Sequence, residues 1–202
     1  PRVDEELLRQ YSDDLIALTG GMNGAVAQQF TNFGPEKALE NINEYKAIYG
    51  DRLYLEFQRV GAPGQDRYNE FLKEVSVTTG VPLVATCDPH YLNPEDAHAQ
   101  EILLCIGAGK TILDDKRLRM PSTQFYFKST EEVLNLFKDV PQAVAETIKI
   151  ADRCNVEFKF SDEKGNTIYH LPTYPVPEGR TIKDEIKRMS EEGLARRFEE
   201  AT

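Results

Sequence analysis

Cysteines are few in this sequence, and they lie far apart. Cys87, Cys105 and Cys154 are the three among 202 residues. An odd number of scattered cysteines argues against a disulfide framework, and the lack of a close pair argues against a zinc-ribbon site. We therefore expect reduced thiols and a cytoplasmic location.

Long hydrophobic runs and an excess of basic charge are also missing. No apolar run approaches the ~18 residues that a membrane-spanning helix needs, and the start of the sequence lacks the charged-then-apolar pattern of a signal peptide. Acidic residues outnumber basic ones by 34 to 24, which gives a net charge of −10. Such a surface repels phosphates overall, so we do not expect this chain to bind DNA or a membrane by itself.

What the sequence does contain is an alternation of short apolar runs and helical stripes. Strands are expected at residues 15–18, 53–57 and 82–86. Asp4 is expected to cap a short helix before the first. A helical stripe from Pro35 to Tyr49, ended by Gly50, precedes the second, and another stripe follows it and ends at Gly80. After the third, Asn93 is expected to cap a helix. Repeated strand–helix units predict an α/β fold with a parallel sheet or part of a barrel.

After Gly107 the alternation stops and helices dominate. A capping box of Ser129 and Glu132 predicts one helix, and Pro141 starts the next. Residues 161–180 are rich in glycine, proline and charge and predict an extended connection. A last, strongly charged helix is expected from residue 182 to residue 200.

The end of the third predicted strand carries a candidate metal site. If the chain stays extended, Val84, Thr86, Asp88 and His90 share one side of it, and Pro89 favours an extended Asp88. A carboxylate and an imidazole at the carboxyl end of a parallel strand suit zinc or manganese. The alternative is that Asp88 only caps the next helix.

The other polar side chains give weaker signals. His98 is expected on a solvated helix face and His170 in an ordinary loop. Without a metal, Asp88 is expected to be buried and to accept hydrogen bonds from backbone N–H groups of the next loop or from a neighbouring side chain. Its replacement by alanine would then cost about 1–3 kcal/mol.

Five segments of the chain resemble, in the same order, segments of the bacterial DNA polymerase III alpha subunits. They are Leu53–Arg59, Leu83–Thr86, Asp88–Leu92, Gly109–Thr111 and Ala151–Asn155. The resemblance covers nearly the whole chain. It implies that residues 1–157 are the C-terminal part of a distorted β/α barrel, the polymerase-and-histidinol-phosphatase (PHP) domain. Residues 158–202 would be a connection and the first helix toward the polymerase palm.

The resemblance also implies which residues could bind metal. The family's PHP site takes an early His-x-His pair, further His and Glu ligands, a cysteine in the loop after a middle strand, and a final Asp-x-His. Asp88 and His90 match the final pair, whereas Gly21, which has no ligand atom, stands at the cysteine position. The His-x-His pair is expected before Pro1 and the polymerase carboxylates after Thr202. The resemblance thus implies a degenerate site and no catalytic residue in this chain.

Three functions follow from the resemblance. The chain is expected to be a scaffold fragment of the catalytic alpha subunit, a DNA-directed DNA polymerase. A metal-dependent phosphoesterase is the first alternative, and a docking module for the proofreading exonuclease is the second. The expected partners are the rest of the alpha subunit, the exonuclease, and DNA only through the parent. No cofactor is expected in the fragment; zinc or manganese belongs to an intact PHP site and magnesium to the parent's polymerase site.

An incomplete barrel has a further structural consequence. Side chains that face the barrel interior, such as Val84 and Thr86, are expected to lose the layer that would cover them. Exposed apolar surface of that kind, with an unpaired strand edge at residues 15–18 or 53–57, would favour self-association by edge pairing or by exchange of the last helix. The alternative is that the N-terminal segment around Leu7 and Leu8 folds over the open face.

Overall fold

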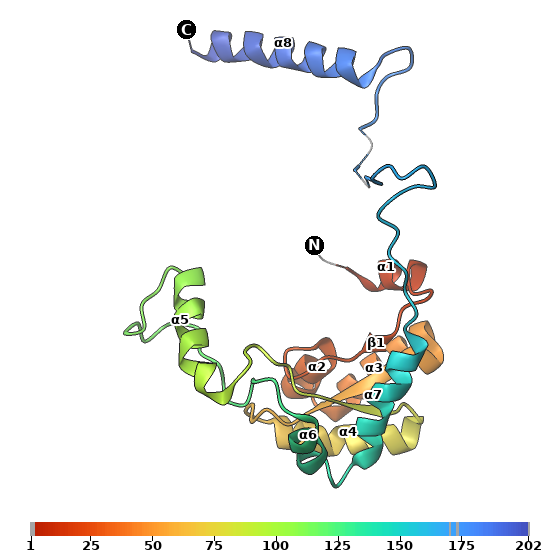
Figure 1. Cartoon of the computed structure of the whole chain (residues 1–202), viewed down its shortest axis with the longest axis vertical. Coiled ribbons are helices and arrows are strands. Elements are labelled where there is room, and N and C mark those ends of the chain that lie inside the picture. The colour runs from red at the N-terminus through yellow and green to blue at the C-terminus, as the bar shows by residue number, and fades with distance from the viewer. Residues whose placement is uncertain (1–2, 170, 173, 202) are drawn as a thin grey trace. The chain divides into compact units, whose positions relative to one another are not determined.

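The computed structural model describes residues 3–169, 171–172 and 174–201 (Figure 1). His170 lies outside these residues, so its position in a loop stays a prediction. The chain divides into two units, Pro1–Asn155 and Val156–Thr202. The assignment of these parts to a PHP domain and a palm also stays a prediction.

A three-stranded parallel sheet organises the first unit. Its strands are β1 (Ala17–Leu18), β2 (Leu53–Gln58) and β3 (Leu83–Thr86), in the order β1-β2-β3. The predicted α/β class with a parallel sheet is confirmed. β1 is shorter than predicted. The guanidinium of Arg52 donates to the carbonyls of Ser12 and Leu15, so the backbone just before β1 bonds to a side chain and not to a neighbouring strand.

The helices follow the predicted caps. Before β3 lie α1 (Glu5–Gln10), α2 (Ala25–Phe33), α3 (Pro35–Tyr49), the 3-10 turn η1 (Gly50–Arg52) and α4 (Gln65–Thr79). After β3 lie the 3-10 turn η2 (Pro94–Asp96), α5 (Ala97–Gly107), α6 (Thr130–Leu136), α7 (Pro141–Arg153) and, in the second unit, α8 (Ile182–Glu200). The Asp4 cap and the Ser129–Glu132 capping box are both present.

The helices differ from the prediction in two places. α2 is not predicted from the sequence; it is a short helix of nine residues whose N-cap, Gly24, makes no side-chain hydrogen bond. The helix expected directly after Asn93 begins instead as the 3-10 turn η2, which the Asn93–Asp96 capping box closes before α5 starts.

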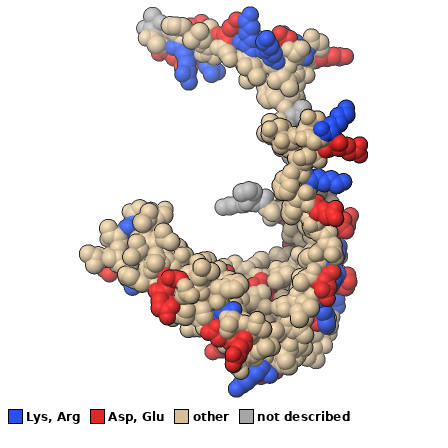
Figure 2. Space-filling model, in the orientation of Figure 1, with Lys and Arg blue, Asp and Glu red and all other residues tan. Residues whose placement is uncertain are grey.

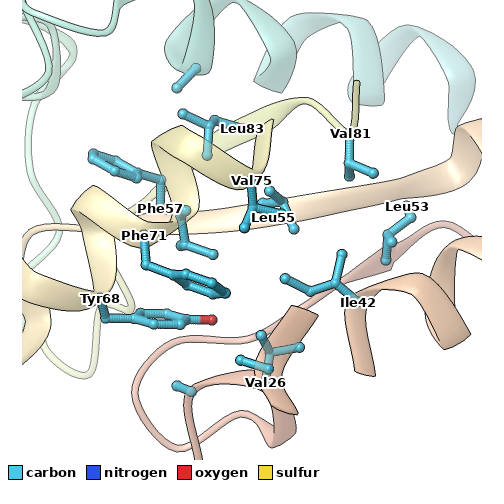
Figure 3. Packing of buried hydrophobic residues seen from close by; sticks show 14 of the residues in the cluster. Val26, Ile42, Leu53, Leu55, Phe57, Tyr68, Phe71, Val75, Val81 and Leu83 are labelled. Carbon is cyan, nitrogen blue, oxygen red and sulfur yellow. The ribbon is translucent and has the colours of Figure 1, made fainter. Parts of the chain in front are cut away.

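The hydrophobic core joins the sheet to the helices that surround it (Figure 3). Side chains of β2 and α4 meet those of α2 and α3 in this cluster, which also takes in Phe137 and Ala143. Leu55 and Phe57 of β2 are fully buried. Phe30 adds aromatic contacts to Tyr68 and Phe71, with ring centroids 5.5 and 4.8 Å apart.

The other side of the sheet is covered as well. Val84 is 2% exposed, and Tyr54 is 3% exposed. Arg153, near the end of α7, donates a hydrogen bond to the Tyr54 hydroxyl at 2.9 Å. The expectation that Val84 would lie uncovered is therefore wrong, and with it the reason given for self-association through that face.

An ion pair joins the end of β2 to the corner between α6 and α7. Arg59 binds both carboxylate oxygens of Asp139 at 2.6 and 2.7 Å and donates to the carbonyl of Leu136 at 2.6 Å. Its guanidinium also lies over the rings of Phe57 and Phe137, 5.3 and 5.5 Å from their centroids. One side chain thus fixes two segments that are 80 residues apart.

This ion pair predicts a dependence of stability on acid. The hydrogen bonds from Arg59 lower the pKa of Asp139 to about 2, whereas an aspartate in an unfolded chain titrates near ~3.9. A lowered folded-state pKa means that the stabilisation is present above about pH 4 and is lost as the pH falls toward about 2. We expect Asp139→Asn to flatten this part of the curve of unfolding free energy against pH. An unchanged slope would show that the pair makes no net contribution.

An arm of the first unit exposes apolar side chains. α5 and the loop after it extend away from the sheet (Figure 1), and the visible face of this arm is mostly uncharged (Figure 2). Its most exposed large apolar residues are Leu103, Ile106, Leu113 and Leu118.

The second unit consists of an extended segment and α8. Phe158 and Phe160 stack on each other and are both more than three-quarters exposed. Thr181 and Asp184 form the capping box of α8, and Glu185 pairs with Arg180 and Arg188. The predicted last helix is confirmed, and so is the extended connection over its described residues, 161–169, 171–172 and 174–180. Among the described residues, no helix combines the length and the hydropathy needed to cross a bilayer.

Candidate functional site

Polar side chains gather where β2 and β3 end. Glu56 and Gln58 alternate with buried apolar residues along β2, and Gln58 lies opposite Thr86 in the parallel register. The Gln58 amide donates to Glu56 Oε1 at 2.8 Å and to Thr86 Oγ1 at 3.1 Å. Thr86 Oγ1 donates to the same Glu56 oxygen at 2.5 Å. These three residues form a closed hydrogen-bonded group, here called the strand-end network.

The loop after β1 is tied to this network. The hydroxyl oxygen of Thr19 accepts a hydrogen bond from the backbone N–H of Glu56 at 2.9 Å, and the Thr19 N–H donates to the carbonyl of Tyr54. Gly24 closes the loop tightly, since a Cβ built on it would lie 2.4 Å from the Thr19 carbonyl oxygen. The loop is therefore held against the ends of the strands before α2 begins.

Gly21 lies in this loop, directly against Gln58. A Cβ at residue 21 would lie 2.0 Å from Gln58 Oε1 and 2.7 Å from Gln58 Cδ. Gln58 itself is only 6% exposed. The space where a side chain of residue 21 would start is thus filled by the Gln58 amide.

Asp88 and His90 lie beyond the end of β3, in a turn. Asp88 has a φ of 46°, in the left-handed region, so the chain does not stay extended through Pro89. The expectation that Val84, Thr86, Asp88 and His90 share one side of a strand is therefore wrong. Aspartate tolerates this conformation better than most residues, and here it outweighs the extended bias that Pro89 imposes.

The two predicted ligands nevertheless lie close together. His90 Nε2 is 3.5 Å from Asp88 Oδ1, and the side chains of His90 and Asp88 are 42% and 49% exposed. The His90 ring also lies edge-on to Phe125, and its backbone N–H donates to the Phe125 carbonyl at 2.7 Å. Asp88 is thus half exposed, and the expectation that it is a buried carboxylate is wrong.

The exposure of Asp88 changes the expected effect of replacing it. Asp88→Asn removes the charge but keeps a residue that tolerates the left-handed backbone, so we expect the unfolding free energy to change by no more than about 0.5 kcal/mol. Asp88→Val should cost more, because a β-branched residue is strained at positive φ. Urea unfolding of both variants measures the difference. A loss above about 1 kcal/mol for Asp88→Asn would restore the paired-carboxylate interpretation.

Among the residues that the structure describes, Asp88 and His90 come without the further ligands that a zinc or manganese site takes. Such sites take three or four protein ligands, whereas Asp88 and His90 are two. Within the described part of the chain, no three or more His, Cys, Asp and Glu side chains come together in a way that could hold a metal ion. His98, the other described histidine, lies on α5 and lines a cavity of about 430 Å³ with Glu95 and Glu101.

A second group of titratable side chains lies beside the loop after β3. Burial lowers the pKa of Lys128 and raises that of the Cys87 thiol. Lys128 Nζ lies 4.0 Å from the centroid of the Tyr126 ring, whose hydroxyl donates to Glu132 at 2.7 Å. These last three residues line an open groove of about 770 Å³, and neither Asp88 nor His90 is part of its lining.

The sequence contained a signal for the strand-end network that went unused. Two polar residues, Glu56 and Gln58, stand in a strand that is otherwise buried and apolar. Side chains two apart on a strand share a face, and Thr86 ends the neighbouring strand. Buried polar side chains need partners, so their pairing could have been proposed.

Comparison with known proteins supports the resemblance seen in the motifs. Residues 1–60 match the PHP domain family. The DNA polymerase III subunit alpha of Borreliella burgdorferi is 38% identical over 203 residues, which cover 100% of this chain and 17% of the relative. The corresponding subunits of Thermus aquaticus and Pseudomonas fluorescens are 35% and 33% identical over 98% and 97% of this chain, and 16% of each relative.

These matches agree in extent. The chain spans about one sixth of the length of the curated relatives that it matches. The prediction from the five ordered segments is confirmed: the chain is similar from end to end to one segment of the DNA polymerase III alpha subunits, and that segment opens with a match to the PHP domain.

Proposed function

We propose that this chain is a scaffold segment of a bacterial DNA polymerase III alpha subunit and contributes structure, not chemistry, to DNA synthesis. The observation that carries the proposal is the full-length match to a sixth of these subunits. It is supported by the polar side chains at the strand ends, which bond to one another in a closed group.

The proposed partner is the remainder of the alpha subunit. Apolar side chains exposed on the α5 arm and along the second unit, such as Leu113 and Phe158, are surfaces that a larger protein would cover. Contact with DNA, magnesium at the polymerase site and a cytoplasmic location would come through the parent. Docking of a proofreading exonuclease is a second partner hypothesis, taken from the family resemblance.

A chimera tests the scaffold role in a working polymerase. The matching segment of the Thermus aquaticus subunit, which is 35% identical, is replaced by this chain. Primer extension and the melting temperature are then measured. We expect the chimera to extend primers, and we expect Asp88→Asn and His90→Gln to leave extension within about twofold.

Two results with the chimera would contradict the proposal. Loss of extension in Asp88→Asn at an unchanged melting temperature would place chemistry at that carboxylate. A chimera that folds but does not extend primers, while the unmodified subunit does, would contradict the scaffold role of this chain.

A metal-dependent phosphoesterase is the competing function, because the Asp88 and His90 side chains lie 3.5 Å apart and a metal could activate water there. We expect the purified chain to release phosphate from p-nitrophenyl phosphate at the background rate with zinc or manganese, since two ligands hold a metal weakly. Release that depends on metal and disappears in Asp88→Ala would establish the phosphoesterase instead.

A further inference from the structure

We propose that the Gln58 side chain fills the space beside the strand-end network, and that residue 21 is glycine because the Gln58 amide occupies the position that a side chain at residue 21 would need. The two residues would thus act as a pair, in which a neutral amide occupies the position where the family resemblance implies a ligand side chain. This inference deepens the proposed scaffold role and rests on it.

The space at residue 21 is the first reason. The φ of Gly21 lies outside the left-handed region, so its backbone would accept a side chain. What excludes one is the contact with Gln58, whose Oε1, Cδ and Nε2 atoms would lie 2.0, 2.7 and 3.0 Å from the Cβ. Each of these distances is at or below the limit that a real Cβ tolerates. The glycine at this position is therefore explained by its neighbour and not by its own conformation.

The fixed position of the amide is the second reason. The end of a glutamine side chain usually moves aside at little cost, but this one is held. Its NH₂ group has two donors, and both are used, one on Glu56 and one on Thr86. Because Gln58 is 6% exposed, water could replace these bonds only after the site opens. Displacing the amide leaves buried polar groups without partners, which is costly.

The network also explains how a carboxylate is kept at the end of a buried strand. Glu56 Oε1 accepts two hydrogen bonds, from Gln58 and Thr86. The backbone N–H of Glu56 donates to the hydroxyl oxygen of Thr19, in the loop that contains Gly21. The Gln58 amide and the Thr86 hydroxyl thus donate to the Glu56 carboxylate oxygen, whose negative charge a cation could otherwise neutralise. Together with the backbone N–H of Glu56, these side chains join β2, β3 and the loop after β1.

A thiol at residue 21 would meet the same obstacle. Gly21→Cys places a Cβ against the Gln58 amide before its sulfur is positioned. Restoring a ligand at this position therefore requires a second change that removes the amide. A single substitution would open the network without creating a site.

A double-mutant cycle on the purified chain tests the pairing. Gly21→Ala, Gln58→Ala and the double variant are compared by urea unfolding, followed by far-ultraviolet circular dichroism. We expect each single change to lower the unfolding midpoint. The double variant should unfold at a higher midpoint than Gly21→Ala alone, because the new methyl group enters the space that the amide has left.

Gly107→Ala is the matched control. A Cβ at residue 107 meets nothing within 4 Å, and the residue lies at the end of α5. Its midpoint should stay at or above that of the unmodified chain. This control separates the contact with Gln58 from a general effect of replacing glycine.

Three results would overturn the pairing: a Gly21→Ala midpoint equal to that of the unmodified chain, additive losses in the double variant, or a double variant that does not fold although Gln58→Ala does. If Gly21→Ala alone fails to fold, a double variant that unfolds cooperatively supports the pairing. The cycle is independent of the polymerase chimera. A positive cycle with an inactive chimera would contradict only the scaffold role.

Discussion

Replacing Phe137 with alanine is expected to lower the free energy of unfolding of the first unit by about 3–5 kcal/mol, the usual cost of removing a fully buried aromatic ring. Phe137 has no exposed surface. Its ring lies edge-on to Phe57, with the centroids 6.1 Å apart, and under the guanidinium of Arg59. The substitution thus leaves a cavity where the α6–α7 corner meets the sheet.

The measurement must suit a chain without tryptophan. Urea unfolding followed by circular dichroism gives the free energy and its slope against denaturant. Phe33→Ala is the matched control, since Phe33 is 70% exposed and its removal should change stability by less than about 0.5 kcal/mol. A loss below about 1 kcal/mol for Phe137→Ala would mean that the corner does not pack on the sheet as described.

Arg59→Ala should have the second largest effect, a loss of about 2–3 kcal/mol. Hydrogen bonds to charged groups contribute about 1.5–3 kcal/mol, and a cation over an aromatic ring adds about 0.5–1 kcal/mol. Arg59 makes both kinds of contact, with a side chain that is 25% exposed. Because the Asp139 side chain is 48% exposed, water compensates for part of the loss, which keeps the estimate below that for Phe137.

Two further substitutions show which property of Arg59 causes the loss of stability. Arg59→Lys keeps the charge but not the planar fork that binds both Asp139 oxygens, so it should recover less than half of the loss. Lys37→Ala removes an exposed ion pair with Glu40 and should leave the free energy of unfolding close to that of the unmodified chain, since water solvates both partners. If Arg59→Ala costs no more than Lys37→Ala, the contacts at the corner do not act together.

Much of the fold follows from local signals. Pro35 and Gly50 bound α3, Gly80 ends α4, and Ser129 with Glu132 starts α6, as their positions in the sequence predict. These predictions succeed because caps and helix breakers act within three or four residues. α2 lacks a capping side chain, and it is the helix that the sequence did not reveal.

The candidate site was predicted only in part. The sequence identified Asp88 and His90, and the structure brings them within 3.5 Å of each other. Their exposure and the left-handed turn at Asp88 were not foreseen, since burial depends on what packs around a turn and not on the turn itself. Glu56 and Gln58 are not predicted as site residues, because the run around them predicts a buried apolar strand, and Thr86 is predicted only as an inward-facing side chain.

By itself, the sequence determined the strand–helix alternation, the helix ends and the similarity to one segment of the DNA polymerase III alpha subunits. These properties reside in short stretches, where a few neighbouring residues set the backbone or make up a motif. Tertiary structure alone decided that Gln58 fills the space beside Gly21 and that Arg59 binds Asp139 across 80 residues. Such contacts depend on how the sheet, the loops and the helices pack in three dimensions, which no local pattern specifies.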